Sequence, residues 1–116
     1  MSNFTSVDQL IASLEKGATD FNSVIQLIES KYDFTPSLFK NGSTINQENT
    51  NNGSCKIFAF GKLNQLSEQA TLNAFGDFYT KDVLQHPDGD DHQNIRNFMK
   101  TGWQGIDFEK QALALK

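Results

Sequence analysis

The chain has 116 residues and a formal net charge of −4. This length predicts one domain over residues 1–116 that buries a core without disulfides or metals, and the single cysteine excludes an intramolecular bridge. The scattered Lys and Arg residues offer no basic stripe, and no apolar run is long enough to cross a bilayer, so neither nucleic acid nor a membrane is an expected partner.

Apolar spacing predicts two short antiparallel helices at the start of the chain. The first follows Thr5 or Ser6 and ends at Gly17, with apolar residues at the i, i+3, i+4 and i+7 positions. The second follows Asp20, which can cap it, and ends near Lys31.

A small β element is expected around residues 34–47. Pro36 and the pair Asn41-Gly42 stand there between apolar residues, which indicates an extended segment that turns back on itself. The polar run over residues 46–54 then predicts a surface loop, which could cover a ligand if it is ordered.

Two further helices are predicted in the middle of the chain. The segment CKIFAFGKL fits either a buried strand or a helix, and Ser54 as a potential cap favours the helix. A longer helix follows Ser67 and is stopped by Pro87.

The C-terminal part is also predicted to be helical. Asp90 or Asp91 caps a helix that ends at Gly102, and Asp107 opens a last short helix toward Leu113.

Ten phenylalanines spread along the chain are expected to form one aromatic core. The elements together predict a mainly α (α+β) fold, a compact single-domain helical fold with a small β element around residues 34–47.

Several segments resemble the HopJ family, which is named for a type III effector of a plant-pathogenic bacterium. The matching segments are YDFTPSLFKNG, NNGSCKIFAF, TLNAFGDFYTKDVLQHPDGDDHQNIRNFMKTGWQGIDF and QALAL. The resemblance implies an uncharacterised type III effector protein and brings no catalytic residue and no known cofactor. It also implies secretion through a type III system. The N-terminus lacks a secretory signal and a flexible leader, which favours a cytoplasmic location instead.

Residues 85–94, called the polar loop below, are the first candidate site. They join both histidines to several carboxylates beside the expected aromatic core, and loops on a folded scaffold commonly carry binding residues. The candidate ligand-binding residues are His86, Asp88, Asp90, His92, Asn94 and Arg96. The leading hypothesis is therefore a small soluble binding domain with an unknown protein or small-molecule partner.

A metal site is an alternative for the same loop. An EF-hand is excluded, because the positions that require Gly and Glu hold Gln93 and Met99. A looser transition-metal site remains open. Its ligands would be His86, Asp88, Asp90 and His92. The competing interpretation is a turn in which aspartates cap a helix.

Cys55 supports the alternative of a small enzyme. A thiol at a helix N-terminus is acidified by the helix dipole, and His92 with Asn94 or Asp90 could complete a nucleophilic site. The competing interpretation is a small buried residue packed beside Phe58.

Arg96 also has two interpretations. It lies one helical turn after His92, where Asp88 or Asp91 could pair with its guanidinium. The functional interpretation is a clamp for an anion or a carboxylate. The favoured one is an ion pair that holds the C-terminal half together.

Overall fold

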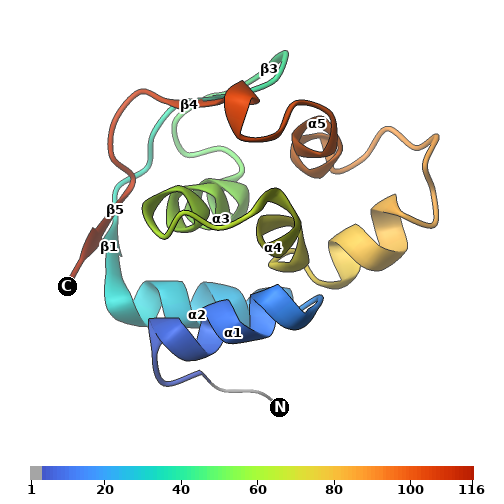
Figure 1. Cartoon of the computed structure of the whole chain (residues 1–116). Coiled ribbons are helices and arrows are strands. Elements are labelled where there is room, and N and C mark those ends of the chain that lie inside the picture. The colour runs from blue at the N-terminus through green and yellow to red at the C-terminus, as the bar shows by residue number, and fades with distance from the viewer. Residues whose placement is uncertain (1–3) are drawn as a thin grey trace.

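The computed structural model describes residues 4–116, and Figure 1 shows their arrangement. The prediction about a leader ahead of the first helix rests largely on residues 1–3 and lies outside the described residues. Within residues 4–116, no helix combines the length and the apolar character needed to span a membrane.

Helices α1 (Val7–Lys16) and α2 (Phe21–Lys31) lie side by side along one side of the molecule (Figure 1). The Ser6 hydroxyl accepts the N–H of Gln9, and the Asp20 carboxylate caps α2 in the same way. Both predicted caps are confirmed, because each side chain satisfies an N–H group that has no partner within its helix.

The predicted β element is also confirmed. Strand β1 (Tyr32–Phe34) precedes an antiparallel hairpin of β2 (Phe39–Asn41) and β3 (Thr44–Asn46). Gly42, in the turn, has a φ of 60°, a left-handed conformation that glycine adopts without steric cost.

The predicted last helix after Asp107 is wrong. The chain is extended there, and strands β4 (Ile106–Phe108) and β5 (Leu113–Leu115) pair with β2 and β1 respectively. Phe108 stacks on Phe39 with the ring centroids 5.3 Å apart. Pairing with distant strands therefore decides the conformation of this segment over its local capping signal.

Helix α3 (Asn52–Leu63) confirms the helical interpretation of CKIFAFGKL. It begins earlier than predicted, because Asn51, and not Ser54, takes the N-cap position. Asn51 is left-handed, with a φ of 51°, and its side chain makes no capping hydrogen bond. The start of α3 therefore keeps its first N–H groups free of a side-chain cap.

The long helix predicted after Ser67 is broken into two parts. Ser67 caps α4 (Glu68–Asn73) as expected, but the chain turns at Gly76, whose φ is 58°. A Cβ at Gly76 would lie 2.8 Å from the carbonyl oxygen of Thr19, so the close approach of α1 and α4 requires glycine. A short π-helix, η1 (Phe78–Val83), follows.

Helix α5 (Gln93–Thr101) ends at Gly102, as predicted. The prediction that Asp90 or Asp91 caps this helix is wrong, because His92 occupies the N-cap position. Its φ is 50°, and its side chain makes no capping hydrogen bond. The turn η2 (Gly102–Gly105) then leads into β4.

The aromatic core centres on α3, which lies between the α1–α2 pair and the sheet with α5 (Figure 1). Phe58 is fully buried, and its ring centroid lies 6.0, 5.5 and 5.0 Å from those of Phe39, Phe75 and Phe98. The fold is mainly helical with small antiparallel sheets, so the predicted α+β class is confirmed.

Candidate functional site

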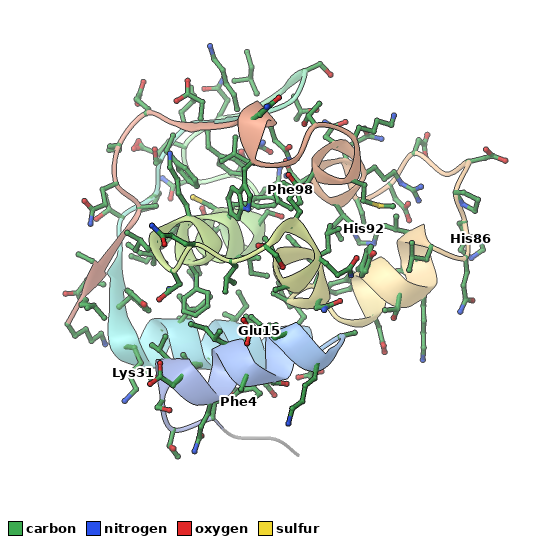
Figure 2. All side chains as sticks on the ribbon, viewed as in Figure 1. Phe4, Glu15, Lys31, His86, His92 and Phe98 are labelled. Atoms are coloured by element: carbon green, nitrogen blue, oxygen red, sulfur yellow. The ribbon has the colours of Figure 1, made fainter. Side chains whose placement is uncertain are left out.

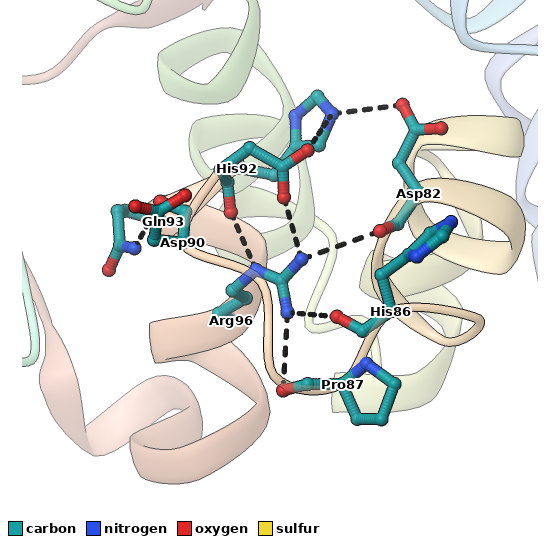
Figure 3. Close-up of polar contacts among 8 residues, drawn as sticks. Asp82, His86, Pro87, Asp90, His92, Gln93 and Arg96 are labelled. Atoms are coloured by element: carbon teal, nitrogen blue, oxygen red, sulfur yellow. Dashed lines mark hydrogen bonds and ion pairs between the residues drawn. The ribbon is translucent and has the colours of Figure 1, made fainter.

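Arg96 holds the polar loop against α5 (Figure 3). Its side chain is buried, with the residue 8% exposed. Nε and Nη2 bind the carbonyl and the carboxylate of Asp91, both at 2.6 Å. Nη1 donates to the carbonyls of His86 and Pro87, and Nη2 donates to that of Asp82. These acceptors match the five N–H groups of a guanidinium, so Arg96 is occupied in fixing the loop.

Asp91 is the carboxylate that pairs with this guanidinium. The hydrogen bond from Arg96 lowers the pKa of Asp91 below its usual value, and the nearby His92 and Arg96 charges act in the same direction. Asp88 makes no contact with Arg96. The structure thus assigns Arg96 the role of an ion-pair partner within the loop.

His92 sits where the polar loop meets α5. Its Nε2 lies 3.0 Å from the Asp82 carboxylate and 4.0 Å from that of Asp91. Its ring centroid lies 5.2 Å from that of Phe78. Both Phe78 and Asp82 belong to the π-helix η1. A π-helix and a left-handed non-glycine residue are both uncommon, and such backbone conformations recur at functional sites.

Four asparagines, Asn41, Asn46, Asn51 and Asn94, form a hydrogen-bonded set called the amide cluster below. Asn94 Oδ1 accepts N–H groups from Asn41 at 3.0 Å and from Asn46 at 2.9 Å. Asn46 Oδ1 accepts from Asn94 at 2.9 Å and from Asn51 at 2.8 Å. Because Asn51 and Asn94 stand at the starts of α3 and α5, the cluster draws these two helix N-termini to the same hairpin.

A pocket of about 490 Å³, called the loop pocket below, opens between these elements. Its lining residues are Phe21, Thr44, Asn46, Asn51, Gly53, Ser54, Phe75, Phe78, His92, Gln93, Asn94 and Ile95. Aromatic rings thus share the pocket with amides, hydroxyls and one imidazole. Its size and mixed lining are typical of sites that bind small molecules.

The structure divides the six predicted site residues into three groups. His92 and Asn94 line the loop pocket, and Arg96 lies beneath the loop. The other three are exposed, and Figure 2 shows His86 at the outer side of the molecule, well away from His92. These exposed residues are His86, Asp88 and Asp90.

Several residues of the site were not predicted as candidates. Phe21 and Phe78 were assigned to helices, and Asp82 was not singled out within its segment. Asn46 and Asn51 belong to the polar run that was expected to cover a ligand, so one signal in the sequence did point to them. Nothing in the sequence showed that Phe78 stays 40% exposed beside a pocket.

The four candidate metal ligands do not converge in this structure. Among residues 4–116, no group of three or more His, Cys, Asp or Glu side chains lies close enough to hold a metal ion. His92 is directed toward Asp82, whereas Asp88 and Asp90 stand exposed at the far side of the loop.

Cys55 is buried in the core, as the structural interpretation expected, with 1% of the residue exposed. Burial raises the pKa of its thiol, although the carbonyl of Ser37 and the charge of Lys56 act in the opposite direction. Cys55 does not line the loop pocket. A protonated, inaccessible thiol lacks the properties of an activated nucleophile.

Comparison with protein families identifies the chain. A family model described as HopJ type III effector protein matches residues 7–113. The chain belongs to the HopJ family. The resemblance noted from the sequence is therefore confirmed over nearly the whole HopJ chain, including the polar loop and every lining residue of the loop pocket.

A solved structure has the same fold as this HopJ chain. It is titled "Crystal structure of unknown function protein VPA0580", has 52% sequence identity and gives a TM-score of 0.93. The alignment covers 99% of the HopJ chain and 97% of the other chain. Comparison with curated proteins gives no match. The arrangement of α3, η1 and α5 thus belongs to a fold that has been solved, but no activity comes with it.

Proposed function

We propose that this HopJ chain is a binding domain for a small molecule, and that its ligand occupies the loop pocket. The observation that carries the proposal is the pocket itself. It joins His92, Gln93 and Asn94 from the loop side to exposed and buried phenylalanines. Its volume of about 490 Å³ falls within the range of roughly 300–1,000 Å³ found for ligand sites.

The polar loop contributes to binding mainly by holding the pocket in shape. Arg96 fixes the loop backbone from below, and the amide cluster fixes the starts of α3 and α5. A site whose side chains are already held in place loses little conformational entropy when a ligand binds. The exposed residues His86, Asp88 and Asp90 are outside the pocket and are not needed for this role.

Native mass spectrometry of protein purified gently from its own organism tests the proposal. The wild type should carry a reproducible added mass that is absent from the denatured protein. His92→Asn should lose this mass, because asparagine tolerates the left-handed conformation of residue 92 but removes the imidazole from the pocket. His86→Asn is the matched control, since it makes the same change at an exposed position of the same loop.

Two results would overturn the proposal. One is a bare wild-type protein in repeated preparations that also shows no saturable chemical-shift change with any member of a fragment library. The other is an added mass that His92→Asn retains and His86→Asn loses, which would place the ligand at the tip of the loop.

The His92–Asp82 pair also supports a second candidate, a small enzyme that uses a His/Asp cluster. A carboxylate 3.0 Å from Nε2 can orient an imidazole and stabilise its charged form, as in general-base catalysis. Asp82→Asn separates the two functions. Binding without catalysis should survive this change, whereas turnover of a bound compound should fall by about 10²-fold or more.

The compartment in which the ligand is encountered can be tested separately. The sequence predicts the cytoplasm, and membership in the HopJ family suggests delivery by a type III secretion system. A reporter fusion of the full chain can be compared in strains with and without a working type III apparatus. Retention in both strains places binding in the bacterial cytoplasm, and apparatus-dependent export places it in the host cell.

A further inference from the structure

One wall of the loop pocket is aromatic. The rings of Phe21 and Phe75 are stacked, with centroids 6.4 Å apart and planes at 25°, and Phe78 meets Phe21 edge-on at 5.1 Å. Phe78 remains 40% exposed even though it is a large apolar residue. A flat ring placed against this wall would cover Phe78 and gain the geometry that aromatic pairs prefer.

The rest of the lining is polar without being charged. Among the described residues that line the pocket, none is Lys, Arg, Asp or Glu. The closest carboxylates, those of Asp82 and Asp91, lie within 4.0 Å of His92 Nε2 and would oppose an anion. They are already paired with His92 and Arg96, which weakens their attraction for a cation. The charge pattern therefore favours an uncharged ligand.

The starts of α3 and α5 supply hydrogen-bond donors to this uncharged pocket. The first N–H groups of a helix have no partner within the helix, and neither Asn51 nor His92 caps its helix with a side chain. Gly53, in the first turn of α3, has no side chain to cover the backbone. A Cβ there would lie 2.8 Å from Cζ of Phe21. Exposed N–H groups beside an aromatic wall suit a ring that carries a carbonyl oxygen.

We propose that the loop pocket binds an uncharged planar ring with a carbonyl oxygen at one edge. The ring packs on the wall of Phe21 and Phe78, and the carbonyl oxygen faces the first turns of α3 and α5. This inference rests on the proposed function, because it names the ligand class of the same pocket.

Three matched probes test the ligand class: benzamide, benzoate and cyclohexanecarboxamide. Benzoate keeps the ring and adds a negative charge, and cyclohexanecarboxamide keeps the amide and removes the planarity. Each is titrated into ¹⁵N-labelled wild-type protein while amide chemical shifts are followed. Benzamide should shift Phe78, His92 and Asn94 saturably, with a dissociation constant on the order of millimolar for so small a molecule. The other two probes should bind at least about fivefold more weakly.

Variants of Phe78 locate the ring. Phe78→Leu keeps an apolar side chain but removes the aromatic face, and it should weaken benzamide about tenfold. Phe78→Tyr restores the face and should restore binding. Leu84→Ala removes an exposed apolar side chain outside the pocket and should leave benzamide binding unchanged. A thermal melt of each variant confirms that it folds.

Each opposing result overturns a defined part of the inference. Benzoate binding as tightly as benzamide would mean an anion site, and equal binding of cyclohexanecarboxamide would mean that planarity has no role. The absence of benzamide shifts up to its solubility would mean that the pocket takes no such ring. These failures leave the binding function standing if native mass spectrometry shows an added mass that depends on His92.

Discussion

Replacing Arg96 by glutamine should loosen the polar loop and lower the stability of the whole chain. The guanidinium reaches acceptors on Asp82, His86, Pro87 and Asp91, whereas the shorter neutral side chain of glutamine cannot bridge them. Each hydrogen bond made by a charged group contributes about 1.5–3 kcal/mol. The freed carbonyls on the exposed loop residues can bind water, so these contributions do not sum. We expect Arg96→Gln to lower the free energy of unfolding by about 2–3 kcal/mol.

Urea unfolding followed by Trp103 fluorescence measures this change. The Trp103 ring packs edge-on against Phe98 with the centroids 5.0 Å apart, so its emission reports on the core. Lys100→Gln is the matched control, because it removes the same charge from an exposed position of α5 and should change the free energy of unfolding by less than about 0.5 kcal/mol.

Hydrogen exchange at Gly89 supplies a local reading of the same prediction. The N–H of Gly89 donates to the carbonyl of His86, which Arg96 also binds. Its protection should fall in Arg96→Gln and stay unchanged in Lys100→Gln. An Arg96→Gln protein with the stability of Lys100→Gln and a protected Gly89 would refute the reasoning that Arg96 organises the loop.

Two further predictions follow from the pKa shifts. The folded pKa of Asp91 is below its unfolded value of about 3.9, so its contribution to stability is present above that pH and is lost as the pH falls through the folded pKa. Asp91→Asn should therefore lose less stability than the wild type between about pH 5 and pH 2 in acid titrations of urea midpoints, and equal losses would contradict the pairing. Cys55, whose pKa is raised by burial, should react with iodoacetamide at neutral pH only after unfolding. Labelling of the native protein at the rate of a free thiol, measured by mass, would restore Cys55 as a candidate nucleophile.

Local signals predicted most of the helices because those helices depend on local chemistry. Ser6, Asp20 and Ser67 all cap helices as expected, and the pair Asn41-Gly42 makes the hairpin turn. The strands at the C-terminus were missed for the opposite reason. They form by pairing with residues that lie about 70 or more positions earlier in the chain, and no local pattern around Asp107 encodes these partners.

The candidate site was predicted in part for the same reason. His92 and Asn94 were identified by their residue types and do line the loop pocket. His86 was selected by type as well, but its orientation depends on how Arg96 folds the loop, which spacing cannot show. The aromatic wall was hidden among ten phenylalanines, since a sequence does not distinguish an exposed ring at a pocket from a buried one.

The amide cluster makes the loop pocket a property of the whole folded chain. Its hydrogen bonds join Asn41 and Asn46 to Asn94 across 53 and 48 positions, and the pocket also needs Phe21 from α2. Opening of any one of these segments would therefore abolish the binding surface. A ligand at 100 times its dissociation constant should raise the global unfolding free energy by about 2.7 kcal/mol. Resistance to proteolysis could thus serve as a readout for a ligand whose identity is not yet known.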